Sequence, residues 1–290
     1  MVHSYAVGNG DMFSIRHNSD NFTIIDCSMS TDDREWILKE LKTQETGKGI
    51  SRFISSHPDQ DHIMGLEYLD DEMPILNFYC VKNDATKTEE TIDFKRYCKL
   101  RDGDKAFNIF KGCSRRWLNL SDEERKTAGI DILWPDVNNT DYKLALTDAA
   151  NGNSPNNISP IIKYGVENSG RFLWMGDLET DFMKRIEEDV DWMSVDVLFA
   201  PHHGRSSGKV PESILSKIDP KIIVIGEAPS EHLNYYGDYN TITQNTAGTI
   251  AFECSSDCID IYVSSPTYLV DFLEDFSEDT YDNYIGTLVV

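Results

Sequence analysis

The chain has 290 residues, of which 40% are hydrophobic and 27% charged, and this composition excludes disordered and fibrous proteins. Its net charge of −23 disfavours nonspecific binding to nucleic acid, because contacts with phosphate supply most of that affinity. No apolar run reaches the roughly 18 residues of a membrane-spanning helix and no signal peptide is recognisable, so we expect a cytoplasmic protein without a membrane partner.

The N-terminal part of the chain predicts strands and helices in alternation. Acidic residues followed by Trp36, Ile37 and Leu41 at helical spacing indicate the first helix. In chain order, the expected elements are a strand over 6–16, a strand over 22–27, a helix over 30–44, a strand over 51–57, a helix over 62–72 and a strand over 75–81.

Residues 84–150 are expected as an insertion or an elaborated lobe. They combine helix-like pieces over 87–100 and 120–129 with a strand over 130–135. Residues 95–126 contain ten Lys and Arg against five Asp and Glu, so the rest of the chain carries −28. This basic segment is either a phosphate-binding patch or a helical segment paired to its acidic surroundings, and the second interpretation is slightly favoured.

Regular structure returns after a loop at 151–157. The expected elements are strands over 158–166, 171–177, 194–201 and 221–226, helices over 178–189 and 211–218, and a hairpin over 248–263. Strands interleaved with helices predict an α/β sandwich with two sheets in the middle and helices outside. We expect one domain over 1–265 and an acidic C-terminal tail over 266–290.

The six cysteines are scattered along the chain and none lies in a C-x-x-C pair. Cys254 and Cys258 flank the turn of the expected hairpin, which leaves a zinc clip as an alternative. Reduced, structural cysteines are the favoured interpretation for a cytosolic protein.

The stretch SSHPDQDHIMGL (55–66) holds four metal-capable side chains within six residues: His57, Asp59, Asp61 and His62. His57 ends an expected strand, and Pro58 favours a break before the helix that follows. Adjacent residues on a regular element point in different directions, so Asp61 and His62 can converge only from a loop or a helix start. The alternative is a polar turn in which Asp61 caps the helix.

Two further strand ends favour the metal-binding interpretation. Asp177 follows an apolar strand and a glycine in FLWMGDLET, and His202 and His203 follow another apolar strand in VLFAPHHG. In layered α/β proteins, sites gather beyond the carboxyl ends of strands. Three separate strand ends therefore each deliver carboxylate or imidazole groups to one candidate site.

The order HxDxDH, GD and HHG resembles the metallo-β-lactamase fold, and in particular the metal-dependent nuclease domain of the ComEC-type DNA-uptake proteins and its free-standing soluble relatives. VGNGDMFSI and TIIDCS are similar to that group's VGQGD and LIDCG, and NNISPII is similar to N-x-x-S-x-V-L. FLWMGDLE resembles LLTGDxE, and PHHGRSSG resembles HHGS. The resemblance spans much of the chain and implies a four-layer αββα sandwich with the 84–150 segment inserted.

The resemblance also implies roles for residues of this sequence. His57 and Asp59 match the ligands of one metal, Asp61 and His62 those of a second, and Asp177 the carboxylate that bridges them. His203 matches a further ligand of the second metal, which leaves His202 as an outer or substrate-facing group. Asn156, its neighbour Asn157 and Ser159 match the polar motif that enters the site.

Two features depart from the family's pattern. Many members have a histidine where this chain has Asp59, and another before the bridging aspartate, whereas this chain has no histidine between His62 and His202. Oxygen-rich ligands shift the preference from zinc towards manganese, so two divalent ions, Zn or Mn, are expected. The late loop lacks the group's Gly-His-Pro, although His232 lies nearby and could compensate.

The leading hypothesis is a hydrolase with a binuclear site that activates water, with Asp59, Asp61 and His202 at the reacting centre. The resemblance implies a phosphodiester substrate, either nucleic acid or a small nucleotide. One alternative is an ester, lactone or thioester hydrolase, which a basic or an apolar pocket rim would distinguish. Another is a metal-binding regulatory or scaffold subunit that holds a protein partner through the insertion or the acidic tail.

Overall fold

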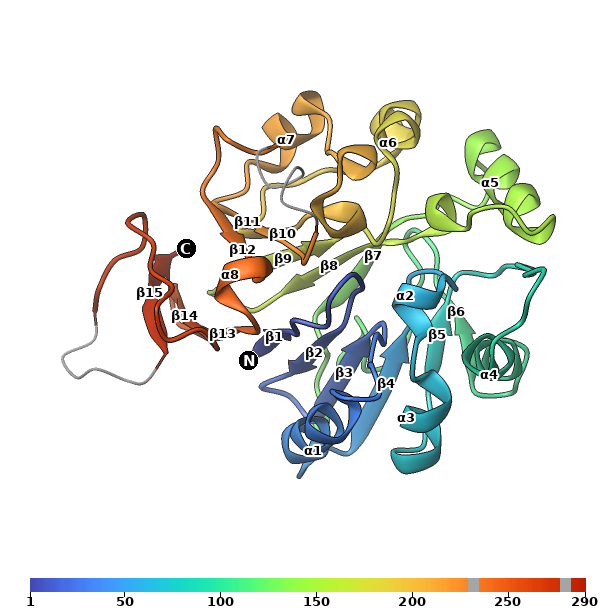
Figure 1. The fold of residues 1–290 in the computed structure, drawn as a ribbon, viewed down its shortest axis with the longest axis horizontal. Coiled ribbons are helices and arrows are strands. Elements are labelled where there is room, and N and C mark those ends of the chain that lie inside the picture. Colours follow the sequence, from blue (N-terminus) through green and yellow to red (C-terminus); the bar gives the residue numbers. More distant parts are fainter. Residues whose placement is uncertain (229–234, 277–282) are drawn as a thin grey trace.

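The computed structural model describes residues 1–228, 235–276 and 283–290. Two β-sheets face each other in the middle of the molecule, and helices cover both outer faces (Figure 1). This arrangement confirms the predicted α/β class and its order of layers: helices, sheet, sheet, helices.

The larger sheet has nine strands and is mixed. Its β3, β4, β5 and β6 run parallel, and the remaining neighbours pair antiparallel. Across the sheet the order is β15 (Tyr284–Val289), β14 (Cys258–Val263), β13 (Ile250–Ser255), β1 (Val2–Ser4), β2 (Phe13–Arg16), β3 (Asn21–Ile25), β4 (Ile50–Ile54), β5 (Phe78–Cys80) and β6 (Ala106–Asn108).

The second sheet has six strands, and its parallel part runs from β9 to β12. Across the sheet the order is β12 (Thr241–Thr243), β11 (Ile222–Ile225), β10 (Val197–Phe199), β9 (Arg171–Trp174), β8 (Ile161–Gly165) and β7 (Ile130–Trp134). Both sheets therefore contain neighbouring parallel strands, whose carboxyl ends share an edge.

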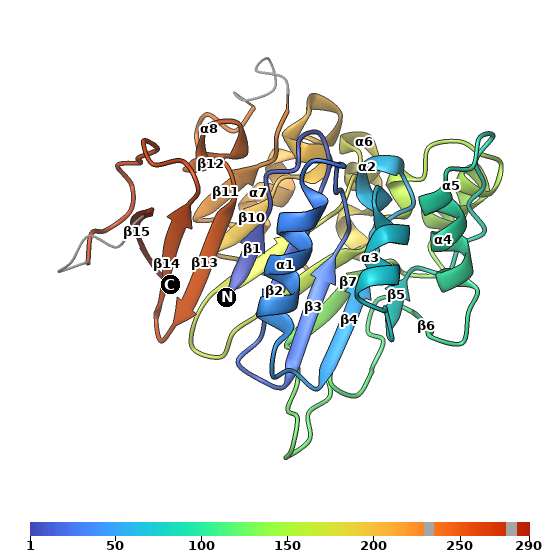
Figure 2. The ribbon, with the colours of Figure 1, turned by 60° about the horizontal axis from the view of Figure 1, so that its bottom comes forward.

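Helices cover the outer face of each sheet. α1 (Arg34–Glu45), α3 (Leu66–Glu72) and α4 (Ile92–Arg101) lie over the larger sheet (Figure 2). α6 (Thr180–Ile186) and α7 (Glu212–Ile218) lie over the smaller one, with α5 (Thr140–Ala150) beside α6 (Figure 1). The short helices are α2 (Gln60–Ile63) and α8 (Gln244–Ala247), and within the described part of the chain no helix could cross a bilayer.

Side chains alternate between two cores along the buried strands. In β3, Phe22 and Ile24 pack with the outer helices, whereas Ile25 packs between the two sheets. The same alternation places Phe53 and Ile54 of β4 in different cores. Successive residues of a strand point to opposite faces, so a strand between two layers contributes apolar side chains to both cores.

Two expected elements near the site differ in the structure. Of the strand expected over 6–16, only Phe13–Arg16 forms a strand (β2), residues 5–12 are a loop, and the unforeseen β1 precedes the expected range. The helix expected over 62–72 is broken at Gly65, whose φ of 86° ends α2 and opens α3. The left-handed conformation is available to glycine without strain, and it turns the chain between the two helices.

The 84–150 segment supplies the edge strand of each sheet, β6 and β7, in addition to α4 and α5. The helix expected over 120–129 is wrong, because those residues form turns and irregular structure. Ion pairs join several cations of the basic segment to carboxylates, which favours the interpretation that the segment is paired to its acidic surroundings. These pairs are Arg96 with Asp70 and Asp71, Arg101 with Asp102, Lys111 with Asp191 and Arg125 with Asp20.

The C-terminal residues add a strand that the sequence analysis did not include. Within the expected tail, Tyr284–Val289 forms β15, which pairs antiparallel with β14. The expected boundary between the domain and the tail at residue 265 stays a prediction, and β15 lies C-terminal to it. In the hairpin, Cys258 is opposite Ser255, so Cys254 and Cys258 point to opposite faces of the sheet, which disfavours a zinc clip.

Candidate metal centre

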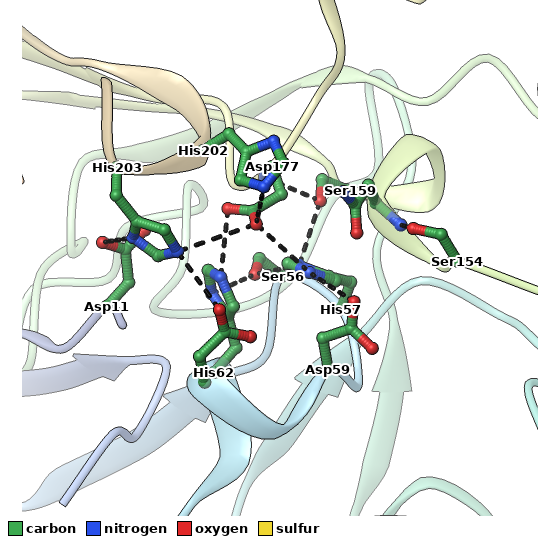
Figure 3. A network of polar contacts seen from close by, with 12 residues as sticks. Asp11, Ser56, His57, Asp59, His62, Ser154, Ser159, Asp177, His202 and His203 are labelled. Atoms are coloured by element: carbon green, nitrogen blue, oxygen red, sulfur yellow. Dashed lines mark hydrogen bonds and ion pairs between the residues drawn. The ribbon is translucent and has the colours of Figure 1, made fainter. Parts of the chain in front are cut away.

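Four strand ends deliver the polar residues of the site to one edge of the two sheets. Asp26 follows β3, His57 follows β4, Asp177 follows β9, and the pair His202 and His203 follows β10. The carboxyl ends of parallel strands meet at the same edge, which is where this kind of fold concentrates its polar groups. Figure 3 shows side chains from both sheets turned towards one another.

Asp177 lies at the centre of this cluster and is almost completely buried. Its carboxylate oxygens lie 3.0 Å from His62 Nε2, 3.6 Å from His202 Nε2 and 3.7 Å from His203 Nε2. The Nε2 atom of His57 is 3.9 Å away (Figure 3). Four imidazoles therefore surround one carboxylate.

The second ring nitrogen of each buried imidazole is held by an oxygen of the protein. His62 Nδ1 lies 2.9 Å from the Asp26 carboxylate, and His203 Nδ1 lies 3.0 Å from that of Asp11. His57 Nδ1 lies 3.0 Å from Ser56 Oγ and 3.2 Å from Ser159 Oγ. Contacts of this kind fix ring orientation and tautomer in metal sites, and here they leave each Nε2 facing Asp177.

Asp11 and Asp26 are functional candidates that the sequence analysis missed. Asp26 follows the apolar strand β3 in TIIDC, the same signal that identified Asp177, and could have been found by it. It also accepts hydrogen bonds from the backbone N–H and the hydroxyl of Ser56, at 2.7 and 2.6 Å. Asp11 lies on the β1–β2 loop, and no local pattern places that loop against His203.

Close packing brings the Asp11 loop to the site. The N–H of Asp11 donates to the carbonyl of Asp61 at 3.1 Å. A Cβ on Gly10 would lie 2.5 Å from that same carbonyl oxygen and 2.3 Å from Ser28 Oγ, so only glycine fits without displacement.

The histidine pair has an unusual backbone. His202 and His203 have φ values of 53° and 56°, the left-handed conformation that costs non-glycine residues roughly 1–2 kcal/mol each. Strain of this size persists where the surroundings impose it, most often at functional sites. The conformation turns both rings towards Asp177.

The proton affinities in the cluster are shifted in opposite directions. Burial favours neutral rings and holds the pKa of His57 well below its ordinary value. Burial acts the same way on His62 and His203, but the negative charges of Asp177 and Asp26 hold the pKa of His62 well above its usual range, and those of Asp11 and Asp177 raise the pKa of His203 to about 10. Protons thus balance buried carboxylates here, a role that metal cations would take over.

The donor set fits divalent metal ions. Within the described residues, the Nε2 atoms of His57, His62 and His203 and Oδ1 of Asp177 are buried without a hydrogen bond of ordinary geometry. Unpaired buried polar atoms are costly, and a divalent cation would satisfy these four together. Among the described residues, ligand atoms of Asp11, His62, Asp177 and His203 all lie within 4.8 Å of one another.

The cluster has two halves on either side of Asp177. On one side, His57 Nε2 lies 3.9 Å from Asp59, and on the other, His203 Nε2 lies 3.5 Å from Asp61. Each side combines imidazole nitrogen with carboxylate oxygen, a set that suits zinc and manganese.

Two cations flank the cluster. The Lys87 ammonium contacts Asp59 closely, and its side chain is partly exposed. Beside the His203 half of the cluster, the Arg205 guanidinium donates to the Asn9 side chain, and in the described part of the chain its Nε is buried without a hydrogen bond. One basic side chain therefore lies near each half of the cluster, alongside the carboxylates of Asp59 and Asp61.

The polar motif after α5 lies beside the cluster, within η1 (Asn156–Ile158) and just after it. Ser159 Oγ accepts from the Asp177 N–H at 3.2 Å, and Asn157 exchanges two hydrogen bonds with Glu179. Asn156 is buried, and no described residue forms a hydrogen bond with its Oδ1. His232, the remaining candidate from the sequence, lies outside the described residues.

No protein-family model matches the chain, and comparison with curated proteins finds no match. Among solved structures, it is similar to the BLEG-1 B3 metallo-β-lactamase, at 16% identity over 61% of this chain and 72% of that one, with a TM-score of 0.33. It is also similar to CmlA, a diiron β-hydroxylase from Streptomyces venezuelae, at 10% identity over 78% of this chain and 44% of that one, with a TM-score of 0.40. TM-scores this low carry no argument about activity.

Proposed function

We propose that the protein is a hydrolase that binds two divalent metal ions and acts on phosphodiesters. One observation carries the proposal: three buried imidazoles direct Nε2 at the buried carboxylate of Asp177, while protein oxygens hold each Nδ1. Such a preorganised, unsatisfied donor set has no structural purpose of its own, since a fully apolar packing would be less costly.

The proposed ligands divide into two groups. His57 and Asp59 would hold one ion, and Asp61, His62 and His203 would hold the other. Asp177 lies between the two groups and would serve both, with zinc or manganese as the metal. When bound, two such ions supply Lewis-acid polarisation of phosphoryl oxygens and a hydroxide nucleophile near neutral pH.

Side chains of the protein would orient the attacking water and transfer protons. Asp59 and Asp61 flank the cluster and would accept hydrogen bonds from the attacking water. His202 is more exposed than the other three imidazoles, and its Nδ1 lies 2.9 Å from Ser207 Oγ. This position at the entrance suits a proton donor to the leaving group.

The two basic side chains beside the cluster, Lys87 and Arg205, favour a phosphate group over a neutral acyl group as substrate. One lies near each half of the cluster, and each could contact an anionic oxygen. Guanidinium and ammonium groups form strong, charge-assisted hydrogen bonds with phosphate. The resemblance to ComEC-type nuclease domains supports the same substrate class, with nucleic acid or a small nucleotide as the candidate.

One observation leaves acyl substrates as a second candidate. An apolar cavity of about 460 Å³ opens near the site, lined in part by Ile109, Phe110, Val137 and Leu146. A hydrolase of esters, lactones or thioesters could place an acyl chain there. The two candidates differ in the reaction they predict.

The test is turnover by purified protein, with manganese and zinc supplied separately. We expect hydrolysis of bis(p-nitrophenyl) phosphate and little hydrolysis of p-nitrophenyl acetate. Asp177→Ala, checked for folding by circular dichroism, should abolish the phosphodiesterase activity. Preference for the acetate would favour the acyl hydrolase, and no turnover by metal-loaded protein would favour a regulatory or scaffold role.

A further inference from the structure

A cavity of about 460 Å³ lies at the same end of the strands as the metal centre. Small-molecule sites commonly have volumes of roughly 300–1,000 Å³. Its walls come from the segment after β5, the end of β6, the loop after β7 and helix α5: Lys82, Asn83, Asp84, Asn108, Ile109, Phe110, Val137, Tyr142 and Leu146.

The cavity is a neighbour of the metal centre. Asp84 lines it, and Lys87, only three residues later, contacts Asp59 at the site. Three residues span at most about 10 Å between Cα atoms, which places the cavity next to the Lys87 side of the site, at a separation of nucleotide scale. A backbone hydrogen bond of 3.1 Å from Thr86 to Ala149 ties this segment to α5.

The walls combine ring faces with unpaired polar groups. Phe110 is 41% exposed although it lines the cavity, and Ile109, Val137 and Leu146 complete an apolar surface. Tyr142 is only 1% exposed, and within the described residues its hydroxyl makes no hydrogen bond. The carboxamide of Asn108 likewise has no hydrogen-bond partner in the described part of the chain.

A flat ring with a polar edge matches these walls better than an alkyl chain. Unstacked bases typically lie against aromatic side chains while their edges form hydrogen bonds, and stacking contributes roughly 1–3 kcal/mol. An alkyl chain would fill the volume but leave the Tyr142 hydroxyl and the Asn108 amide unpaired, which costs about 1–3 kcal/mol for a buried group.

We propose that this cavity binds a nucleobase, and that the phosphate attached to the same nucleoside lies at the metal centre. The inference rests on the proposed phosphodiesterase function and specifies its substrate class as nucleotidyl. The base could belong to a free nucleotide or to the end of a single strand, and the binding experiment distinguishes these two sources.

Two substitutions on α5 provide a matched test. Leu146→Trp fills the cavity, whereas Leu144→Trp, two residues away and 58% exposed, adds the same side chain outside it. We expect adenosine and AMP to bind the wild type and Leu144→Trp at least tenfold more tightly than Leu146→Trp, as measured by calorimetry in EDTA. Val137→Trp, at a position that is 48% exposed, is a second filling variant should Leu146→Trp fold poorly.

Binding in EDTA does not depend on hydrolysis, so failure of the phosphodiesterase proposal leaves the cavity testable. Equal binding of adenosine to all variants, or displacement of bound adenosine by hexanoate at similar concentration, would overturn the nucleobase assignment. Tighter binding of a short oligothymidylate than of thymidine monophosphate would support a strand end, and the reverse would support a free nucleotide.

Turnover supplies an independent readout if the phosphodiesterase proposal holds. In Leu146→Trp, KM for thymidine 5′-(p-nitrophenyl phosphate) should rise at least tenfold, while KM for methyl p-nitrophenyl phosphate stays unchanged. Equal effects on both substrates would contradict a base-binding cavity, because only the first substrate carries a base.

Discussion

At the scale of single residues, the fixed second nitrogen of each imidazole distinguishes the site from an ordinary polar cluster. Asp26 is the most informative of these partners, because it is buried, contacts His62 Nδ1 directly and reaches His57 Nδ1 through the Ser56 hydroxyl. Such outer partners typically contribute a factor of 10–100 to metal affinity.

Asp26→Asn should therefore lower the affinity for zinc and manganese roughly 10–100-fold while the fold is retained. Asparagine preserves the shape and tolerates the left-handed backbone of this position, where φ is 56°. Metal titration with a competing chelator measures the effect, and Asp32→Asn on the surface is the control. Equal affinities for the two variants would show that Asp26 does not act through His62.

Lys87→Met should lower kcat/KM for a phosphodiester at least tenfold and leave hydrolysis of a neutral ester unchanged. The reason is the loss of a cation beside Asp59 that can contact the substrate's anionic oxygen. Lys95→Met, which removes an exposed lysine from α4, is the matched control. A similar loss with both substrates would instead indicate damage to the metal centre.

The sequence predicted the residues that follow apolar strands, because strand ends are readable from local pattern. His57, Asp177 and His203 were placed correctly at such ends, and the structure brings them together. Asp11 was not foreseen, since its role depends on a contact between residues 192 apart in the chain. Lys87 was not foreseen either, because its role depends on a contact with Asp59, which lies 28 residues earlier in the chain.

At the scale of elements, the β1–β2 loop depends on one glycine for its approach to the site. Gly10→Ala should destabilise the protein by about 1–3 kcal/mol and weaken metal binding, because a Cβ there meets Ser28 and the Asp61 carbonyl. Gly165→Ala, whose Cβ would meet only Lys163 at 3.9 Å, should be nearly neutral. Thermal unfolding and metal titration compare the two variants, and equal effects would contradict the steric argument.

The last strand, β15, packs on the core beside β14. Leu288 is 8% exposed and belongs to the core, whereas its neighbour Val289 is 47% exposed. Leu288→Ala should lower the free energy of unfolding by about 2 kcal/mol or more, and Val289→Ala by no more than about 0.5 kcal/mol. Equal small effects in denaturant titrations would mean that residues 284–289 contribute little, as expected of a tail.

Short edge elements were the hardest to predict. β6 and β12 have three residues each, too few to show a period-2 pattern, and their pairing partners define them. Helix α5 was missed because Leu144 is exposed on it, which obscures the amphipathic pattern. The buried strand β11 was found, because its continuous apolar run bounded by turn residues is a local signal.

At the scale of the whole molecule, the layer order followed from the alternation of strands and helices, and the pairing of strands within each sheet did not. Sheet order depends on contacts between distant segments, such as β1 with β13. Local sequence carries no information on these contacts, whereas it does encode the burial of each strand face.

Stability should fall in mild acid through a half-buried histidine on β1, outside the metal centre. Burial lowers the pKa of His3 on β1 to about 4, whereas its unfolded value is about 6.5. The unfolded state therefore binds more protons between these values, and stability present above pH 6.5 is lost as the pH falls towards 4. His3→Gln should reduce this loss by about 2 kcal/mol between pH 7 and 4.5 in urea titrations, and an unchanged pH slope would contradict it.

The most direct test of the central claim is the number of metal ions bound per chain, measured by elemental analysis after equilibrium dialysis against manganese or zinc. We predict two ions for the wild type and at most one for Asp177→Ala, since that carboxylate lies between the two ligand groups. Two ions in both proteins, or none in the wild type, would contradict a binuclear centre built on Asp177.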